Sequence, residues 1–399
     1  MIKLMIIDEY KIVNYSGGIE RVICNLANAL IEKNYVVDIV CLDTEKGRPA
    51  YHLDERVGFI NLAFAGKPYK NLTLLLRKLQ KEILRAIAGS KMILFGQKIQ
   101  DPKYNYFTNQ FINRLRKVVI EKQPDIILSV SPDSAYFVNQ AAPEIKHIMM
   151  CHVDVRRLLQ EMTEDNKDKS IFQKVDAVQV LMPSYVDSML NTGAKFIKCI
   201  PNCVNQINRC SLKLDKQQNN RIITVGRVEK YLKRTHLLVE AFCKIHKQIP
   251  EWELYIYGNI DSRSYYKNIL KIISKYNCEN KVNFMGTTDK IIDELEKADI
   301  FALPSASEGF SLALTEAMSV GLPVVGYKSC GMVNEIIKDN INGILCDEGT
   351  DSLSCALLKL AGNNSLRYQL GNQARNDMEL YKPENIWNQW DCFIKKVIH

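Results

Sequence analysis

The chain has 399 residues, of which 47% are hydrophobic and 25% are charged, and its formal net charge is +8 at pH 7. This composition is that of a globular protein and excludes an intrinsically disordered chain. It also excludes a membrane-spanning bundle, because no stretch reaches the roughly 18 apolar residues that a spanning helix needs. A chain this long exceeds one hydrophobic core, so we expect two domains of about 150–200 residues each.

The twelve cysteines are scattered through strand-like and helix-like runs. None forms a CxxC pair, and no His/Cys cluster has zinc spacing. Cys41 and Cys346, for example, lie in apolar segments. We therefore expect reduced, mostly buried thiols in a cytoplasmic protein.

The N-terminal half alternates short apolar runs with helical patterns. Its start, MIKLMIIDEY, resembles a signal peptide only as far as Asp8, where the apolar run stops, so residues 3–8 are expected to form a buried strand. An amphipathic helix is expected at 18–33. Further strands are expected at 36–42, 57–63, 125–131, 146–152 and 177–182. Buried strands separated by helices predict a doubly wound parallel sheet.

The C-terminal half repeats this alternation, with strands expected at 221–227, 252–258, 281–286, 299–305, 323–327 and 343–347. Between the halves, residues 201–220 are polar and show no periodicity, which indicates a linker. We expect an α/β protein in which two Rossmann-like domains face each other across a cleft and bind ligands beyond the carboxyl ends of their strands. The expected parts are an N-terminal domain at 1–205, a C-terminal domain at 206–380, and a C-terminal helix at 381–399 that packs back toward the N-terminal domain.

Positive charge is concentrated in residues 65–122, which contain 13 Lys or Arg against 3 Asp or Glu, while the rest of the chain is about neutral. The basic residues alternate with apolar runs such as LTLLL and EILRAIA. This mixture favours a surface that lies on anionic lipid headgroups. A solvated helix face is the plainer alternative. A nucleic-acid surface is disfavoured, because the segment contains no recognised binding module.

Glu308 and Glu316 are the only charged residues in SASEGFSLALTEAMSVGLPVV, at 305–325. A carboxylate among apolar residues is costly unless something pairs with it. The preceding strand is expected to end at Pro304, and the helix that follows, at about 310–320, is stopped by Gly321. This places Glu308 in the strand-to-helix loop at the mouth of the cleft and Glu316 about two turns along the helix.

The segment around these glutamates offers three kinds of group to a ligand. The N–H groups of the first helical turn, at 309–312, can bind an anion. The two carboxylates can accept hydrogen bonds from hydroxyls. The alternative for Glu308 is a helix N-cap, worth about 1 kcal/mol. The alternative for Glu316 is a solvated helix position, which its apolar neighbours disfavour.

EGFSLALTE, at 308–316, resembles the E-x7-E signature of the retaining glycosyltransferases of family 4, which have the GT-B fold. Other segments resemble the same family, and they occur in the same order. The N-terminal Gly-Gly loop and helix of the family resemble SGGIERVICNLANAL, and its interdomain motif resembles IPNCVN. The "GR…K" segment of the family resembles VGRVEKYLKRTHLLVEAF, and the block after its signature resembles AMSVGLPVV. The resemblance covers essentially the whole chain and implies an enzyme of the bacterial surface-polysaccharide type. It further implies a nucleotide diphosphate sugar as donor substrate and no cofactor.

The resemblance implies which residues bind the donor. These are Gly17, Gly18, Arg227, Lys233, Glu308, Gly309, Phe310, Ser311, Leu312 and Glu316. Arg227 and Lys233 bind the diphosphate, since a guanidinium fork and an ammonium match the charge that bond cleavage leaves there. No metal is then required, and the chain shows no paired Asp signature for one. Glu316 holds the ribose hydroxyls, and Glu308 holds those of the transferred sugar.

Four residues are expected to act in catalysis, namely Arg227, Lys233, Glu308 and His152. His152 ends the strand expected at 146–152, where the family often places a histidine near donor and acceptor. Taken alone, a histidine is more often structural, and Arg227 alone is more simply a surface cation. Gly17 and Gly18 let the backbone approach a phosphate or the acceptor closely, although a bare Gly-Gly is neither GxGxxG nor a P-loop.

The chain departs from the family pattern at three places. Ser311 stands where the family's EGFGL has glycine, beside the expected phosphate and sugar. Residues 201–205, PNCVN, differ from the family's PNGVD at the hinge. Gly258 and Asn259 replace a GxG turn, so no role is carried over to them. Glu20, after the Gly-Gly loop, is left without a role.

The implied reaction moves a hexose or N-acetylhexosamine, with retention of configuration, from the donor to a saccharide acceptor. We expect this acceptor to be lipid-linked. We expect this to serve capsule, O-antigen or exopolysaccharide synthesis, with the enzyme in the cytoplasm and attached peripherally to the inner face of the membrane through 65–122. Two alternatives remain open: a GT-B phosphorylase or nucleotide-sugar epimerase, and a non-catalytic partner subunit. The E-x7-E pattern together with the "GR…K" segment argues against both.

Overall fold

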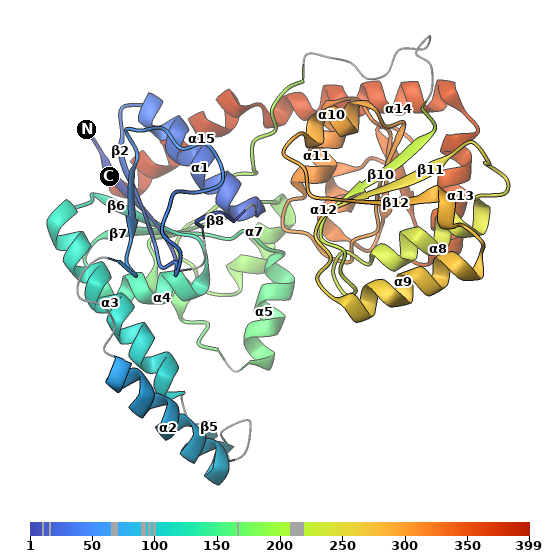
Figure 1. The fold of residues 1–399 in the computed structure, drawn as a ribbon. Helices are drawn as coiled ribbons and strands as arrows, with labels where there is room; N and C mark the ends of the chain where they lie inside the picture. The colour runs from blue at the N-terminus through green and yellow to red at the C-terminus, as the bar shows by residue number, and fades with distance from the viewer. Residues whose placement is uncertain are drawn as a thin grey trace.

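A computed structural model describes residues 1–9, 12–15, 17–64, 71–88, 93–94, 97–98, 101–165, 167–207 and 219–399. Two α/β domains lie side by side, one formed by the N-terminal and one by the C-terminal half of the chain (Figure 1). Each domain contains one parallel sheet with helices packed against it.

The N-terminal sheet has seven strands in the order β3-β2-β1-β6-β7-β8-β9, and every adjacent pair is parallel. Its strands are β1 (Lys3–Asp8), β2 (Val36–Cys41), β3 (Gly58–Asn61), β6 (Ile126–Ser129), β7 (Lys146–Met150), β8 (Ala177–Val180) and β9 (Ile197–Cys199). The helices of this half are α1 (Gly18–Glu32), α2 (Asn71–Ala88), α3 (Pro102–Lys122), α4 (Pro132–Ala141), α5 (Val155–Glu164), α6 (Ile171–Lys174) and α7 (Pro183–Leu190). A short antiparallel pair, β4 (Ile93–Leu94) and β5 (Gln97–Lys98), lies between α2 and α3 in the chain.

The C-terminal sheet has six parallel strands in the order β12-β11-β10-β13-β14-β15. Its strands are β10 (Arg221–Val225), β11 (Glu253–Tyr257), β12 (Val282–Gly286), β13 (Ile300–Leu303), β14 (Val324–Tyr327) and β15 (Gly343–Cys346). The α-helices are α8 (Thr235–Ile245), α9 (Arg263–Lys275), α10 (Ile291–Glu296), α11 (Leu312–Ser319), α12 (Gly331–Ile336), α13 (Thr350–Ala361), α14 (Asn364–Asp377) and α15 (Pro383–Ile398). Two short 3-10 helices are η1 (Glu279–Lys281) and η2 (Met378–Tyr381).

Several of these strands are buried along their whole length, which explains their continuous apolar sequences. Every residue of β6, β8, β13, β14 and β15 is buried. Helices cover both faces of a parallel sheet, so both sets of alternating side chains point into a core. Such runs are readable from sequence, and the doubly wound, two-domain architecture expected above is confirmed.

Apolar packing continues from one domain into the other. One hydrophobic cluster contains Met149 and Tyr185 of the N-terminal half together with Phe301 and Leu314 of the C-terminal half. The carboxyl ends of β7 and β13 border this cluster, because β7 contributes Met149 and β13 contributes its last residue, Leu303. The region between the sheets is therefore held by direct contact between the domains.

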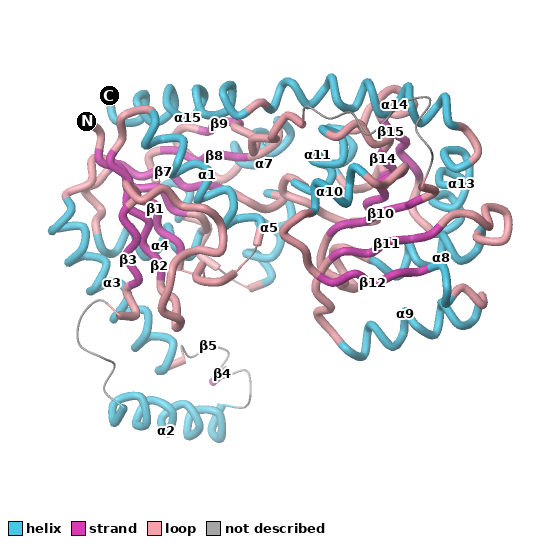
Figure 2. The backbone as a smooth tube through the Cα atoms, turned by 45° about the horizontal axis from the view of Figure 1, so that its top comes forward, coloured by secondary structure: helices cyan, strands magenta, loops and turns pink. Residues whose placement is uncertain are grey.

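The last helix, α15, packs on the N-terminal domain. Ile386, Trp390 and Phe393 belong to the same hydrophobic cluster as Leu4 of β1 and Leu26 of α1. In Figure 2, α14 and α15 run one after the other along the molecule, and the two chain termini lie near each other at the N-terminal domain.

Three local differences separate the structure from the expectations. Strand β9 was not expected, because its three residues, 197–199, show no buried apolar run. The strand expected at 146–152 ends at Met150, so His152 lies two residues beyond it in a loop. The helix expected at about 310–320 begins at Leu312, because the preceding Ser311 caps it.

Helix α2 extends away from the N-terminal domain beside α3 (Figures 1 and 2). Many of its apolar side chains are exposed, namely those of Leu72, Leu75, Leu76, Leu79, Ile83 and Ile87. None of the helices in the described ranges is both long and apolar enough to cross a membrane.

Candidate active site

The expected donor residues of the C-terminal domain follow two neighbouring strands. Arg227 and Lys233 lie in the loop after β10, and Glu308 lies in the loop after β13. β10 and β13 are adjacent and parallel, so the two loops leave the same edge of the sheet side by side.

Lys233 and Glu308 form an ion pair between these loops. The Nζ atom of Lys233 lies 2.6 Å from Oε1 of Glu308, and the two side chains are 23% and 10% exposed. A charge this far from water needs a partner, and each group supplies one for the other. The structure thus brings together the cation expected at the diphosphate and the carboxylate expected at the sugar.

The loop that carries Lys233 is shaped by Glu229, a residue that the sequence did not single out. Its carboxylate accepts hydrogen bonds from the backbone N–H groups of Tyr231, Leu232 and Lys233 at 2.6, 2.8 and 3.0 Å. Burial raises the pKa of Glu229, but these hydrogen bonds lower it more, so the net shift of its pKa is downward. The ionised carboxylate therefore folds the loop under Lys233.

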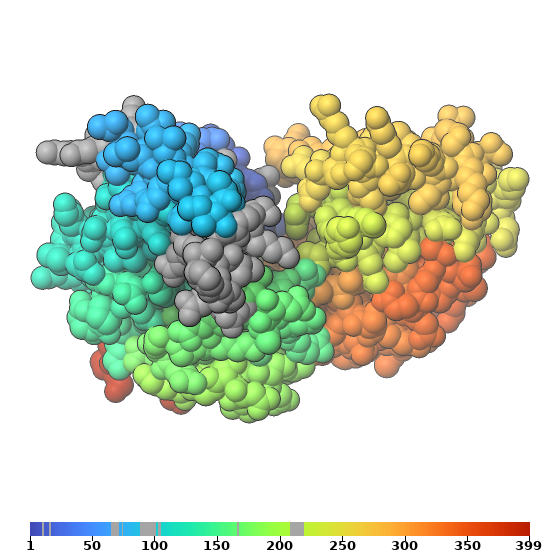
Figure 3. Space-filling model, turned by 90° about the horizontal axis from the view of Figure 1, so that it is seen from below, coloured from blue at the N-terminus to red at the C-terminus, as the bar shows by residue number. Residues whose placement is uncertain are grey.

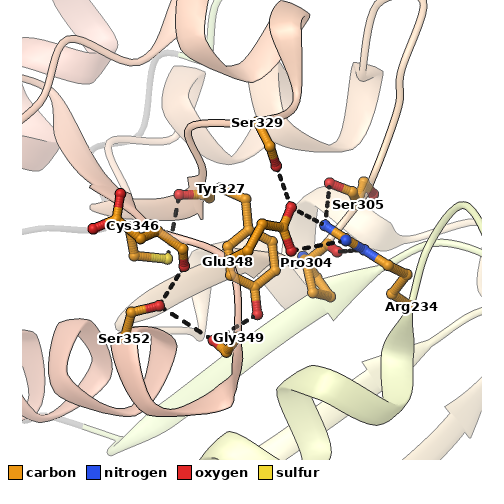
Figure 4. A network of polar contacts seen from close by, with 11 residues as sticks. Arg234, Pro304, Ser305, Tyr327, Ser329, Cys346, Glu348, Gly349 and Ser352 are labelled. Carbon is orange, nitrogen blue, oxygen red and sulfur yellow. Dashed lines mark hydrogen bonds and ion pairs between the residues drawn. The ribbon is translucent and has the colours of Figure 1, made fainter.

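Arg234, the next residue, ties this loop to the rest of the sheet edge (Figure 4). Its guanidinium donates to the carbonyl oxygens of Pro304 and Ser305 at 2.9 and 3.2 Å and forms a two-pronged ion pair with Glu348 at 2.9 and 3.1 Å. The same group stacks over the ring of Tyr327 at 4.9 Å. Because Pro304 and Ser305 lead into Glu308, Arg234 fixes the start of the glutamate loop against the lysine loop.

Arg227 is oriented differently from Lys233. Its guanidinium pairs with Asp261 at 3.0 Å, and its side chain is 54% exposed. The backbone just before Arg227 does lie near Lys233, because a Cβ at Gly226 would lie 3.5 Å from Cδ and Cε of Lys233. The guanidinium of Arg227, which pairs with Asp261, is not part of the Lys233–Glu308 pair.

The N-terminus of α11 is capped by Ser311, the residue that departs from the family pattern. Its Oγ accepts a hydrogen bond from the N–H of Leu314 at 3.4 Å. This excludes the alternative in which Glu308 caps the helix, since the carboxylate of Glu308 faces Lys233 instead. Because α11 begins at Leu312, the N–H groups that the helix leaves without an intrahelical partner are those of about 311–314, and Ser311 binds that of Leu314.

Glu316 lies on α11 and pairs with a residue of the other domain. Its Oε1 contacts Nη2 of Arg21, which lies on α1, 295 residues earlier in the chain. The glutamate side chain is 7% exposed and that of the arginine is 27% exposed. A solvated position for Glu316, the alternative left open by the sequence, is therefore wrong.

The N-terminal domain also contacts the backbone beside Glu308. Tyr185 of α7 donates its hydroxyl to the carbonyl oxygen of Glu308 at 2.7 Å. At Gly309 a Cβ would collide with the carbonyl oxygen of His152 and would lie 2.8 Å from its carbonyl carbon. Only glycine permits this approach, so the sequence EG at 308–309 brings the two domains into backbone contact.

Two side chains at the edge of the N-terminal sheet each keep one buried polar atom without a partner among the described residues. Nε2 of His152 is buried and has no hydrogen-bond partner among the described residues, and burial lowers the pKa of this histidine to about 4. Glu9, directly after β1, accepts a hydrogen bond from Ser131 at 2.6 Å, but its Oε2 is buried and has no described partner. Burial raises the pKa of Glu9 to about 7. Both environments favour the neutral form of the group.

The Gly-Gly loop lies against α11. A Cβ at Gly18 would lie 3.8 Å from Cδ1 of Leu312, so Gly18 and the first residue of the helix are neighbours across the domain interface. At Gly17 the place of a Cβ is taken by the carboxylate of Glu20, which folds back over the loop. Within the described ranges, no group of three His, Cys, Asp or Glu side chains is arranged to hold a metal ion.

The family model for glycosyl transferases group 1 matches residues 210–377, which include the loop with Arg227 and Lys233 and the whole E-x7-E segment. This part of the chain is similar to the group 1 glycosyl transferases. Members of this family use nucleotide-sugar donors. The family resemblance inferred from the sequence is thereby confirmed.

Curated proteins similar to this chain include an uncharacterized glycosyltransferase of Haemophilus influenzae, which is 27% identical over 388 residues, or 94% of this chain and 95% of the relative. The amylovoran biosynthesis glycosyltransferase AmsD of Erwinia amylovora is 29% identical over 188 residues, or 47% of this chain and 51% of the relative. Among solved structures, a variant of S. aureus TarM in complex with fondaparinux, alpha-GlcNAc-glycerol and UDP superposes with a TM-score of 0.76 at 19% identity, covering both chains completely. This likeness shows the GT-B fold.

Several residues of this site escaped the sequence. Arg21, Arg234, Glu229 and Glu9 were not considered. A signal for Arg234 exists in hindsight, because it follows Lys233 directly in the "GR…K" segment. No local signal marks Arg21 or Glu9, because each owes its surroundings to segments far away in the chain.

Proposed function

We propose that this enzyme moves a hexose or N-acetylhexosamine from a nucleotide diphosphate sugar to a saccharide acceptor, and that the Lys233–Glu308 pair is the centre of its donor site. The pair carries the proposal because it sets a cation beside a hydrogen-bond acceptor, with 2.6 Å between Nζ and Oε1. A donor presents a diphosphate and sugar hydroxyls within the same short span. The ammonium suits the first and the carboxylate the second.

The diphosphate is assigned to Arg227, Lys233 and the N–H groups at 309–312. The exposed guanidinium of Arg227 can leave Asp261 for a phosphate at little cost, because a surface ion pair contributes only about 0–1 kcal/mol. Residues 309 and 310 belong to the loop before α11, and Ser311 and Leu312 belong to its N-terminus, where unpaired N–H groups favour anions. Cations and N–H groups aimed at the leaving diphosphate stabilise the charge that develops there during bond cleavage.

The hydroxyl groups of the donor are assigned to the two glutamates. Glu308 takes those of the transferred sugar, and Glu316 takes those of the ribose. Gly309, Phe310, Ser311 and Leu312 shape the floor between them. Phe310 supports this assignment, since its ring is buried against Tyr381, with ring centroids 5.6 Å apart, and holds the loop in place.

The chemical step needs no nucleophile from the protein. The acceptor oxygen forms the new bond to the anomeric carbon on the face from which the diphosphate leaves, the bond from that carbon to the phosphate oxygen breaks, and the leaving phosphate takes the proton of the acceptor hydroxyl. Configuration is retained. The two domains exclude water, which would otherwise hydrolyse the donor.

The acceptor is assigned to the N-terminal domain, residues 1–205, and the donor to residues 206–380, with 381–399 returning to the N-terminal domain. Three residues of the N-terminal domain lie at its boundary with the C-terminal domain, namely His152, Gly17 and Gly18. The carbonyl of His152 approaches Gly309, and Gly18 neighbours Leu312. We assign them to the place where donor and acceptor meet. The partial match to a protein named for amylovoran biosynthesis supports a role in capsule, O-antigen or exopolysaccharide synthesis.

The acceptor is proposed to be lipid-linked, and α2 is proposed to rest on the anionic inner face of the cell membrane. Leu72, Leu76, Leu79 and Ile83 recur at helical spacing and are 69%, 57%, 54% and 59% exposed. The opposite face carries Lys81, which pairs with Asp101 next to α3. The side of α2 that carries Lys81 is therefore turned toward α3 and the apolar side is turned outward, whereas Arg85 remains 45% exposed. Figure 3 shows α2, in bright blue, on the outer surface of the N-terminal half.

Vesicle sedimentation tests the membrane contact. The wild type is expected to sediment with vesicles that contain anionic lipid and to remain in solution with zwitterionic vesicles. The triple variant Leu75→Ser/Leu79→Ser/Ile83→Ser and the variant Lys78→Glu/Arg85→Glu should both lose sedimentation. Ile120→Ser is the matched control, because Ile120 is 67% exposed on α3. Equal sedimentation of all variants contradicts the proposal, and self-association that only the triple variant abolishes identifies α2 as a contact between copies of the chain instead.

A panel of nucleotide sugars tests the reaction itself. Transfer to a saccharide, or slow hydrolysis of one donor with retention of configuration, is the expected result. Phosphorolysis of a glycan or epimerisation of the donor would support the alternative enzyme class. Binding that stabilises the protein without any turnover would support the non-catalytic subunit.

A further inference from the structure

The ion pair between Arg21 and Glu316 joins the two domains at the residue proposed to hold the ribose. Arg21 belongs to the second turn of α1, and Glu316 lies in the middle of α11. Their side chains meet through Nη2 and Oε1. The carboxylate of a C-terminal site residue is thus neutralised by a cation of the N-terminal domain.

The surroundings of Glu316 explain why it needs this cation. Its helix neighbours from 314 to 319 are all buried. Two other titratable groups lie close to the pair, Tyr51 and Cys203, and burial raises the pKa of both, to about 11 for Cys203. Both are therefore neutral at pH 7. Arg21 is the cation that the described structure places against this carboxylate, and without it a buried charge would lack compensation.

The geometry of the pair leaves room for a ligand. Arg21 contacts Oε1, while Oε2 of Glu316 makes no hydrogen bond to any residue in the described part of the chain. An ionised carboxylate has about four acceptor positions on its two oxygens. An ion pair on one oxygen therefore fixes the orientation of the group and leaves the other oxygen able to accept from hydroxyls.

We propose that Arg21 is a positioning residue for donor recognition, which pairs with Glu316 and orients it so that Oε2 accepts hydrogen bonds from the ribose hydroxyls. The inference rests on the proposed function, in which Glu316 binds the ribose. It adds that the donor site of the C-terminal domain is completed by the N-terminal domain. It also gives Arg21 an effect that is specific for the ribose part of the nucleotide.

The test compares two ligands on one protein. Isothermal titration of the full-length chain measures the affinities of UDP and 2′,3′-dideoxy-UDP, or of the GDP pair if the donor panel selects GDP. The wild type is expected to prefer the ribonucleotide by about tenfold or more, which is what hydrogen bonds to a charged group contribute. In Arg21→Met the ribonucleotide should lose most of this advantage, while the dideoxy affinity stays nearly unchanged.

Two further variants complete the design. Arg21→Lys keeps the positive charge and is expected to retain most of the ribose preference. Arg56→Met is the matched control, because Arg56 pairs with Glu32 and Asp54 at the surface of the same domain, and it should behave like the wild type. If Arg21→Met does not fold, Arg21→Gln replaces it. Affinities are measured below the melting temperature of the variant used.

The outcomes separate this inference from the proposed function. A wild type without ribose preference contradicts the ribose role of Glu316 itself. A normal wild-type preference that survives in Arg21→Met overturns the inference and leaves the proposed function standing. Equal weakening of both ligands shows that Arg21 acts only on the arrangement of the domains, and it overturns the inference, as does a loss in Arg21→Lys as complete as in Arg21→Met.

Discussion

The carboxyl edges of the two sheets differ in how their polar groups are paired. On the C-terminal sheet three cations after β10 face carboxylates: Arg227 with Asp261, Lys233 with Glu308, and Arg234 with Glu348. On the N-terminal sheet Glu9 and His152 each keep a buried polar atom that has no partner in the described part of the chain. At these positions one edge carries paired charges, and the other carries two groups, Glu9 and His152, whose neutral forms burial favours.

This difference matches the two substrates that a glycosyltransferase brings together. A donor diphosphate is charged, and an edge with exchangeable ion pairs can accept it by trading a carboxylate for a phosphate. An acceptor offers neutral hydroxyls, and burial favours the neutral forms of both Glu9 and His152 by raising the pKa of the first to about 7 and lowering that of the second to about 4. The comparison predicts that donor binding at the C-terminal edge depends mainly on charge, whereas acceptor binding at the N-terminal edge depends mainly on hydrogen bonds.

The largest effect is expected at Glu308. The substitution Glu308→Gln keeps the shape of the side chain but removes the charge that faces Lys233. We expect kcat to fall by about 10³-fold, the upper range for losing one group that stabilises a developing charge. Initial rates with the donor identified by the panel measure this. A rate within fivefold of the wild type would remove Glu308 from the proposed mechanism.

A smaller loss is expected at Lys233. Lys233→Met removes the ammonium while keeping the stem that packs over Gly226. We expect kcat/KM for the donor to fall by about 10²-fold, since charge-assisted contacts to phosphate are among the stronger hydrogen bonds. Lys244→Met is the matched control, because Lys244 pairs with Asp351 on the surface of the same domain and should leave the rate unchanged. Similar rates for the two variants would contradict a charged donor edge.

Contact between the two edges is tested at Gly309. Gly309→Ala adds a methyl group that collides with the carbonyl of His152, so the domains must separate slightly. Transfer should slow by about tenfold, because a small misplacement of the reacting groups is costly, while UDP or GDP binding changes little. Gly362→Ala, whose Cβ would approach no closer than 3.4 Å, is the control. Wild-type transfer by Gly309→Ala would show that catalysis does not require this contact.

The smallest effect concerns the neutral edge and pH. Glu9 has a folded-state pKa of about 7 against 4.5 for the ordinary group, so the folded protein binds the proton more tightly than the unfolded chain. The associated stability is present below pH 4.5 and is lost as the pH rises through 7. In the wild type this contribution lowers the free energy of unfolding by about 1 kcal/mol per pH unit between pH 5 and 7, and in Glu9→Gln the decrease should be absent. Urea unfolding at several pH values measures the difference. Parallel pH profiles for the two proteins would show that Glu9 is not held neutral.

Much of the fold was predictable, because it depends on local pattern. Strands such as 300–303 and 324–327 are continuous apolar runs that only a sheet covered on both faces can bury. The place of Glu308 in a strand-to-helix loop followed from Pro304 and Gly321 in the same way. The capping role of Ser311 was missed because a serine before a helix looks the same in sequence whether or not its side chain is free to bind a ligand.

Contacts between distant segments were not predictable. Arg21 and Glu316 are 295 residues apart, and the helical pattern around Arg21 is explained by apolar burial alone. The segment at 65–122 showed basic and apolar residues, but only the pairing of Lys81 with Asp101 reveals which face of α2 is turned outward. A single sequence carries propensities and periods, whereas such pairings depend on how whole elements pack.

The most direct test of the account measures how the two glutamates divide the donor. Calorimetric affinities are compared for the nucleoside diphosphate and for the corresponding nucleotide sugar in the wild type, Glu308→Gln and Glu316→Gln. The account predicts that Glu308→Gln weakens the nucleotide sugar by about tenfold relative to the nucleoside diphosphate, whereas Glu316→Gln weakens both ligands by the same factor. If Glu308→Gln weakens both equally, or if Glu316→Gln affects only the nucleotide sugar, the division of sugar and ribose between the two glutamates is wrong.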